Sequence, residues 1–149
     1  MKLDESIGYL IARAHKSIRR KFMAILKDFD LTERQYQVLH RLHEEEDGLP
    51  AHELVDRLFS DSSTIVAIID RLEEKGLVRR EGNPDDRRMK HIFLTDKSRE
   101  MMPKLLHRTR ELELAKRSEL TPKEIEVLKS ALTKLFEFGM NDEKGVPDD

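Results

Sequence analysis

The segment VRREGNPDDRRMKHIFLT, residues 78–95, limits what this chain can fold into, because it interrupts a sequence that is otherwise helical in pattern. Two short apolar runs flank four turn-forming residues, namely Asn83, Pro84, Asp85 and Asp86. This composition is typical of a reversal between two antiparallel strands. The turn opens directly into Arg87 and Arg88. An exposed ion pair contributes too little stability to explain two arginines there, so we expect a β-hairpin whose tip another molecule contacts.

A first helix is expected over residues 5–27, because apolar residues recur there at spacings of three and four. These residues are Ile7, Leu10, Ile11, Ala14, Ile18, Phe22, Ile25 and Leu26. The other face of the helix is basic and carries Arg13, Lys16, Arg19, Arg20, Lys21 and Lys27. This basic face is interpreted either as a solvated surface or as a surface that faces an anion.

A second helix should begin after Thr32, because Thr32 and Gln35 have the spacing of a capping box. Gly48 is expected to end it. Pro50 then stands at the first position of a short third helix. The apolar residues of this third helix that we expect to face inward are Leu54, Leu58 and Phe59.

The fourth helix is expected to start with Ser62 as its cap and to end at Gly76. Its apolar stripe consists of Ile65, Ile68, Ile69 and Leu72. The opposite face consists of Ser63, Val66, Ala67, Asp70 and Glu74. Two helices joined by a tight turn, the second with small outward residues in its first half, indicate a helix-turn-helix. In a motif of this kind the start of the second helix typically enters the major groove of DNA.

After the hairpin, Thr95 is expected to cap a long helix that runs to about Leu120, with Pro103 kinking it or splitting its first turns. A last helix has three start signals, which are Thr121 as cap, Pro122 at the first position and Glu124 completing a capping box. The predicted fold is mainly α with a small β-wing, a winged helix-turn-helix flanked by N- and C-terminal dimerisation helices. We expect one domain over 1–149, with the DNA-binding lobe at 32–95, dimerisation helices at 5–28 and 96–140, and a frayed tail at 141–149.

Composition excludes several classes of protein. The chain of 149 residues has no cysteine, which rules out a disulfide, a thiol switch and a thiolate metal site. It has no apolar run of about 18 residues that could span a membrane, and its N-terminus lacks the features of a signal peptide. A cytoplasmic protein is therefore expected. With a net charge of −2, a nucleic acid would have to be bound by local basic patches.

The pattern LT..QY.VL..L......L....L...L..D.ST.....D.LE.KGLV.R.....DRR...I.LT closely resembles the MarR family of transcription regulators. The resemblance covers about residues 5–140. The SlyA-like branch is the most similar, because MKLDESIGYLIARAH and LHRLH also resemble it. The resemblance implies a homodimer that binds double-stranded DNA at a pseudo-palindromic operator, with a repressor released by a small ligand as the expected mode of action.

For the hairpin, the resemblance implies that Arg88 enters the minor groove, whose negative potential attracts arginine where the groove is narrow. Asp86 would orient the guanidinium, while Arg87 and Lys90 would neutralise phosphates. The alternative is an ordinary charged hairpin.

For the fourth helix, the resemblance implies that Ser62, Ser63 and Thr64 bond phosphates or base edges. Val66 and Ala67 stand where relatives commonly carry Thr and Arg, and this removes the usual long donor for guanine. We therefore expect DNA reading to rely on contact with thymine methyl groups and on DNA shape. His52 either touches the DNA backbone or is a surface histidine without a role.

The resemblance also implies a pocket for aromatic carboxylates or other lipophilic anions, with Arg13, Thr32 and His40 at matching positions. For His40, a hydrogen-bonded histidine near the core is the alternative. His40 and His43, three residues apart, could hold a metal if His107 or a glutamate supplied a third ligand, so a metal-responsive regulator stays open. No cofactor is expected.

Two other classes of protein fit the sequence less well. An enzyme would need a nucleophile with its base, a glycine-rich phosphate loop or a metal cluster, and the sequence contains no motif of these kinds. A protein-interaction module that has lost specific DNA reading is supported only by Val66, Ala67 and the acidic net charge. The DRR sequence at the hairpin, which has no other evident use, argues against such a module.

Overall fold

The structure is a computed structural model that describes residues 1–83 and 85–141, without the side chains at 83 and 86–88. Of the predicted frayed tail at 141–149, residues 142–149 lie outside the described residues. The chain forms two compact units, the first over residues 1–109 and the second from residue 110. No described helix is long and apolar enough to cross a membrane.

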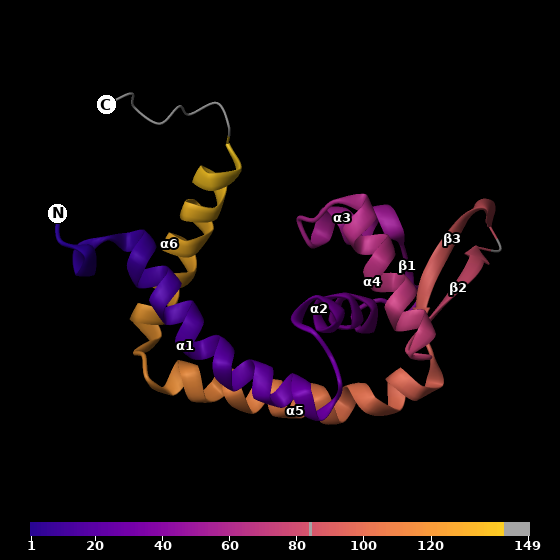
Figure 1. Cartoon of the computed structure of the whole chain (residues 1–149), viewed down its shortest axis with the longest axis horizontal. Helices are drawn as coiled ribbons and strands as arrows, with labels where there is room; N and C mark the ends of the chain where they lie inside the picture. Colours follow the sequence, from indigo (N-terminus) through magenta and orange to yellow (C-terminus); the bar gives the residue numbers. More distant parts are fainter. Residues whose placement is uncertain (84, 142–149) are drawn as a thin grey trace. The chain divides into compact units, whose positions relative to one another are not determined.

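The predicted class, mainly α with a small β-wing, is confirmed (Figure 1). The elements are η1 (Leu3–Glu5), α1 (Ile7–Asp28), α2 (Glu33–His43), β1 (Leu49–Pro50), α3 (Ala51–Arg57), α4 (Ser62–Glu74), β2 (Val78–Asn83), β3 (Asp86–Leu94), α5 (Asp96–Ser118) and α6 (Pro122–Met140). The helices α2, α3 and α4 pack together with the sheet in the first unit.

Several helix starts follow the predicted capping chemistry. The Thr32 hydroxyl accepts the Gln35 N–H at 3.1 Å, and the Gln35 side chain accepts the Thr32 N–H at 3.1 Å, which completes the capping box of α2. Thr121 caps α6 by accepting the Glu124 N–H at 3.2 Å. The predicted second half of that box is wrong, because the Glu124 carboxylate accepts the Thr121 hydroxyl at 3.0 Å instead of the backbone N–H.

Four local predictions around the second to fourth helices are wrong. Helix α2 ends at His43, and Gly48 lies beyond it in a left-handed turn with φ 66°. Pro50 is extended, pairs with His91 in the sheet and forms the N-cap of α3 rather than its first residue. Phe59 does not face inward but is 66% exposed, because its φ of 50° turns the chain away from the core. Asp61, not Ser62, caps α4.

The sheet has three antiparallel strands in the order β1-β3-β2. The predicted hairpin is β2–β3, with Val78 opposite Leu94 and a shift of register between Gly82 and Asn83. The strand β1, which pairs Leu49 with Ile92, was not predicted. Two residues are too few to show the alternation by which a strand is recognised.

Helix α5 passes through Pro103 without a break, so the predicted alternative of two split segments is wrong. Thr95 precedes this helix as predicted. Its hydroxyl accepts the Ser98 N–H at 3.4 Å and donates to the Gly76 carbonyl at 2.6 Å. The first bond caps α5, and the second ties its start to the turn at the end of α4.

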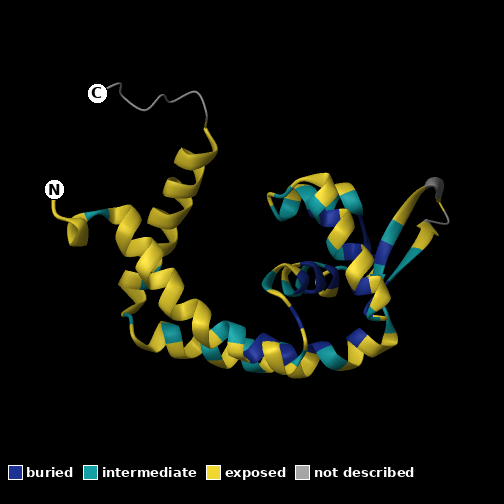
Figure 2. Ribbon diagram, viewed as in Figure 1, coloured by how far each residue is buried: buried dark blue, intermediate teal, exposed yellow. Residues whose placement is uncertain are grey.

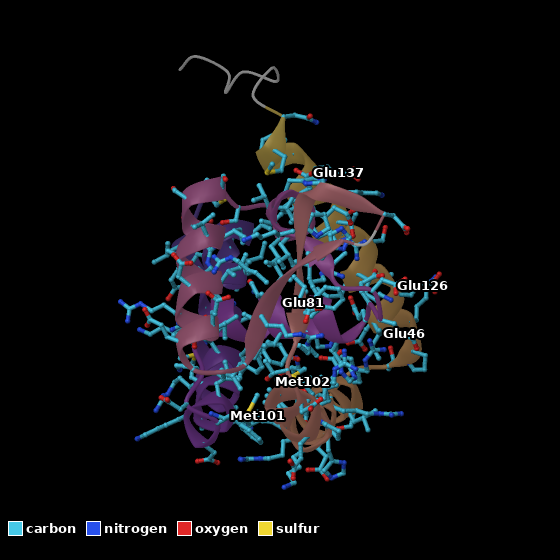
Figure 3. All side chains as sticks on the ribbon, turned by 90° about the vertical axis from the view of Figure 1, so that its right-hand side faces the viewer. Glu46, Glu81, Met101, Met102, Glu126 and Glu137 are labelled. Carbon is cyan, nitrogen blue, oxygen red and sulfur yellow. The ribbon has the colours of Figure 1, made fainter. Side chains whose placement is uncertain are left out.

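The core lies in the first unit (Figure 2). Its most completely buried side chains are Leu26, Val38, Leu39, Leu42, Leu54, Ile65, Ile69, Leu72, Val78, Ile92, Met102 and Leu105. Each such side chain contributes about 1.5–3 kcal/mol by leaving water. Met102 is fully buried and its neighbour Met101 only half-buried (both labelled in Figure 3), because successive side chains of a helix point about 100° apart. In α6, by contrast, no residue is buried.

Candidate nucleic-acid interface

Helices α3 and α4 pack against each other across a turn of four residues, 58–61. The inner side of α4 is anchored by Ile65, Ile69 and Leu72, which are at most 1% exposed. Since these residues point into the core, the opposite side of the same helix faces outward. The exposed residues on its first two turns are Ser62, Ser63, Val66 and Ala67, as predicted.

The carboxylate of Asp61 organises the start of α4. It accepts the Thr64 N–H at 2.8 Å, the Ser63 hydroxyl at 2.7 Å and the Thr64 hydroxyl at 2.7 Å. These hydrogen bonds, the one from Ser63 first, hold the pKa of Asp61 well below its usual range. The sequence interpretation missed Asp61, although an aspartate three residues before Thr64 is itself an N-cap signal.

This network determines what the two hydroxyls can offer a ligand. An ionised carboxylate only accepts, so the hydroxyl protons of Ser63 and Thr64 must both point to Asp61. The oxygen lone pairs of the two hydroxyls remain available to accept hydrogen bonds from a ligand. Acceptors at this position suit the amino groups of adenine or cytosine in the major groove better than they suit phosphate oxygens.

Arg80 joins the first hairpin strand to α4. Its guanidinium lies 2.5 Å from the Asp70 carboxylate and 2.8 Å from the Glu73 carboxylate, and its side chain is 26% exposed. Hydrogen bonding to Asp70 raises the pKa of Arg80 further above its usual value. The sequence interpretation assigned Asp70 to the outer face of α4, and the structure shows that it serves to fix β2 there.

Arg79 is also used within the protein. It donates to Glu81 at 2.6 Å and to the Leu94 carbonyl at 2.7 Å, and its guanidinium lies 5.1 Å from the centre of the Phe93 ring. Glu81, labelled on the hairpin in Figure 3, has its pKa lowered by the hydrogen bond from Arg79. Arg79 therefore holds the two hairpin strands together at their base, whereas Arg80 fixes β2 to α4.

Nearer the tip, Lys90 is exposed on β3 and makes no ion pair with the described side chains. The side chains of Asp86, Arg87 and Arg88, which the sequence analysis assigned to DNA, lie outside the described residues. His52 is exposed in the first turn of α3.

The three residues predicted to bind a ligand are not brought together. Arg13 is exposed and lies 3.9 Å from Asp4. Thr32 lines a cavity of about 490 Å³. His40 lines a different cavity, of about 410 Å³, and its imidazole lies 3.4 Å from the Glu44 carboxylate. Thr32 and His40 stand at opposite ends of α2, about 12 Å apart along its axis.

The metal alternative finds no support from geometry. Among the described residues, no three His, Asp or Glu side chains lie close enough to share a metal ion. In particular, no third ligand completes a site with His40 and His43.

The pair α3–α4 followed by the hairpin β2–β3 defines this chain as a winged helix-turn-helix protein. Residues 29–89 match the MarR family. The chain is 36% identical over 99 residues to the HTH-type transcriptional regulator SarZ of Staphylococcus saprophyticus, covering 66% of this chain and 67% of SarZ. The chain belongs to the MarR family. It is also 40% identical over 103 residues to the regulator TtmR of Methylorubrum extorquens, a match that covers 69% of this chain but only 52% of TtmR, about half its length.

Solved structures agree with this assignment. CouR from Rhodococcus jostii RHA1, bound to p-coumaroyl-CoA, is similar with a TM-score of 0.82 and 26% identity, covering 91% of this chain and 94% of CouR. MepR of S. aureus, in complex with DNA, is similar with a TM-score of 0.80 and 27% identity, covering 89% and 97%. Membership of the SlyA-like branch stays a prediction.

Proposed function

We propose that this protein is a homodimeric transcription regulator that binds a pseudo-palindromic DNA site and acts as a repressor released by a small anionic ligand. The observation that carries the proposal is the exposed face of Ser63, Val66 and Ala67 on α4, beside a hairpin fixed to the same helix by Arg80. The DNA complex of MepR, a protein of similar fold, supports it. A cytoplasmic location stays a prediction.

On DNA, the start of α4 enters the major groove. Ser63 and Thr64 accept hydrogen bonds from base amino groups, and Val66 and Ala67 contact thymine methyl groups. Ser62, at the first position of the helix, and His52, on α3, contact the DNA backbone. The hairpin lies along the adjacent minor groove, with Arg88 inserted and held by Asp86, while Arg87 and Lys90 neutralise phosphates.

The proposed dimer is supported by the exposed apolar stripe of α6. Leu128, Leu132 and Leu135 are 46%, 42% and 39% exposed and follow one another at helical spacing. A second copy is the simplest cover for such a stripe. A two-fold axis then presents two α4 helices to successive major grooves about 34 Å apart.

The proposed ligand is an aromatic or lipophilic anion. CouR, which is similar in structure, is known bound to p-coumaroyl-CoA. In this chain the cavity lined by Tyr36, His40 and Phe59 combines aromatic rings with a histidine, and Tyr36 and His40 have ring centres 5.6 Å apart. Ligand binding weakens DNA binding, and by reciprocity DNA weakens ligand binding by the same factor.

The test uses fluorescence anisotropy with the duplex upstream of the protein's own gene and a scrambled duplex, at several salt concentrations. Arg88→Ala should weaken binding to the first duplex strongly and lower the salt dependence, because one cation is lost from the DNA contact. The matched control is Lys104→Ala, an exposed position on α5, which should change neither. If Arg88→Ala abolishes dimerisation in light scattering and leaves DNA affinity intact, the proposal is wrong.

A further inference from the structure

The outward face of the first two turns of α4 combines one polar side chain with two apolar ones. Val66 is 41% exposed, and Ser63 and Ala67 are exposed beside it. Residues three and four apart on a helix are surface neighbours, with Cβ atoms about 5–6 Å apart. The Ser63 hydroxyl therefore lies next to the methyl groups of Val66 and Ala67, and a ligand on this face meets both kinds of group together.

The direction in which the Ser63 hydroxyl can hydrogen-bond is fixed by Asp61. The hydroxyl donates to the Asp61 carboxylate at 2.7 Å, and the N–H and hydroxyl of Thr64 donate to the same carboxylate at 2.8 and 2.7 Å. These bonds lower the pKa of Asp61, so the carboxylate stays ionised and has no proton to donate back. Toward a ligand, the Ser63 oxygen is thus an acceptor.

The next part of the same face adds a second acceptor. Asp70 follows Ser63 by seven residues, about two helical turns, and its side chain is 55% exposed although one carboxylate oxygen lies 2.5 Å from Arg80. Val66 and Ala67 stand between these two acceptors along the helix. None of the side chains of Ser63, Val66, Ala67 and Asp70 has a donor left for a ligand, so this strip offers only oxygen acceptors and methyl groups.

The bases of DNA differ in what they present to such a strip in the major groove. Thymine presents the O4 acceptor beside its methyl group, and cytosine presents the N4 amino donor without a methyl group. A thymine O4 opposite the Ser63 oxygen would place two acceptors face to face, and neither would gain a hydrogen bond. A cytosine methylated at C5 presents the amino donor and the methyl group side by side, which suits both Ser63 and Val66.

We propose that α4 binds a DNA site in which the base facing Ser63 and Val66 is 5-methylcytosine. The Ser63 oxygen accepts from the N4 amino group, and the C5 methyl group packs against Val66 and Ala67. Methylation of this cytosine then raises the occupancy of the site. The inference rests on the proposed function, because it requires the start of α4 to lie in the major groove.

The experiment is fluorescence anisotropy of the full chain on a duplex selected from a random library. At each position of one half-site, four base pairs are compared, namely cytosine–guanine, 5-methylcytosine–guanine, thymine–adenine and uracil–adenine. At one position we expect methylation of cytosine to tighten binding about fourfold, the value of one buried methyl group. At the same position thymine should bind about fivefold more weakly than 5-methylcytosine, because a hydrogen bond is lost.

Three variants separate the contacts. Val66→Ala should remove the gain from methylation and keep the preference for cytosine over uracil, whereas Ser63→Ala should do the converse. Asp61→Asn keeps the helix cap, but its amide can donate to Ser63 and free the hydroxyl proton for thymine O4. The ratio of affinities between 5-methylcytosine and thymine should then fall. Lys104→Ala, exposed on α5, is the control and should change no ratio.

Equal binding of cytosine and 5-methylcytosine at every position would overturn the inference, and so would a gain from methylation that survives Val66→Ala. Preferences for the methyl group and for the amino group that fall at different positions would show that two bases, not one, satisfy the strip. An unchanged ratio in Asp61→Asn would overturn the role of Asp61. If no duplex is bound at all, the proposed function itself fails and the inference with it.

Discussion

Gly48 and Gly76 turn the chain with similar dihedral angles, φ 66° and 71°, in different surroundings. A Cβ on Gly48 would lie 2.5 Å from the Ile92 carbonyl oxygen and 3.0 Å from the Phe93 ring. A Cβ on Gly76 would meet nothing closer than the Lys97 side chain at 4.0 Å. At Gly48 a side chain is excluded both by the left-handed backbone and by the neighbouring atoms. At Gly76 only the left-handed backbone disfavours one.

We therefore predict that Gly48→Ala and Gly76→Ala differ in their cost. A left-handed alanine costs about 1–2 kcal/mol of unfolding free energy, and this should be the whole effect at Gly76. At Gly48 the contact with backbone must also be relieved, so a loss of about 3 kcal/mol or more is expected. Urea unfolding of the two variants measures the difference. Equal losses would show that the sheet around Ile92 yields without cost.

Among elements, the joint between α4 and β2 depends on Arg80 and its two carboxylate partners. The partners are about half exposed, with side-chain values of 55% for Asp70 and 45% for Glu73, so solvent screens the attraction. The contact of Arg80 with α4 therefore contributes more to the position of the hairpin than to the stability of the fold. It fixes the angle at which the hairpin leaves the helix that carries the candidate DNA-reading face.

A double-mutant cycle of Arg80→Ala and Asp70→Ala should give a coupling of about 1 kcal/mol in unfolding free energy. Arg80→Ala should in addition weaken DNA binding, because the hairpin loses its fixed orientation. A cycle of Arg71→Ala with Asp70→Ala is the control, since Arg71 is exposed on α4 without a described partner, and it should show no coupling. A coupling near zero for Arg80 and Asp70 would show that this ion pair does not contribute to the stability of the fold.

The elements that the sequence predicted are those encoded by neighbouring residues. Thr32 and Gln35 are three residues apart, and Thr121 and Pro122 are adjacent, so both helix starts could be predicted from the local pattern. The short β1 depends on a partner strand more than 40 residues later, between Leu49 and Ile92, and carries no pattern of its own. The same holds in the candidate site. The exposed face of α4 can be predicted from the helical spacing of its apolar residues. The contact of Arg80 with Asp70 forms only when the hairpin packs against α4.

For the molecule as a whole, the two units differ in how their apolar residues are covered. The first unit buries a core of its own, whereas α6 buries none of its residues and keeps Leu128, Leu132 and Leu135 exposed (Figure 2). A helix of this kind is stabilised chiefly by what packs against its stripe. The proposed second copy supplies that packing.

Leu132→Asp should therefore convert the dimer to monomer, because a carboxylate would be buried without a partner at the centre of the stripe. Lys134→Asp, on the opposite side of α6, makes a change of similar chemistry and should leave the dimer intact. Light scattering after size exclusion measures both. A monomeric wild type, or a dimer that tolerates Leu132→Asp, would place the interface elsewhere.

The uncovered stripe of α6 has a consequence in terms of mass action. Where folding of an element is completed by association, the population of folded chain depends on the total amount of protein. For the proposed dimer, the melting temperature should then rise with concentration, and the number of copies in a cell would set the fraction of chains that is folded and able to bind the proposed DNA site. Synthesis of the protein would raise both the number of chains and the fraction of them that is folded, since each new chain is a possible dimer partner for the chains already present.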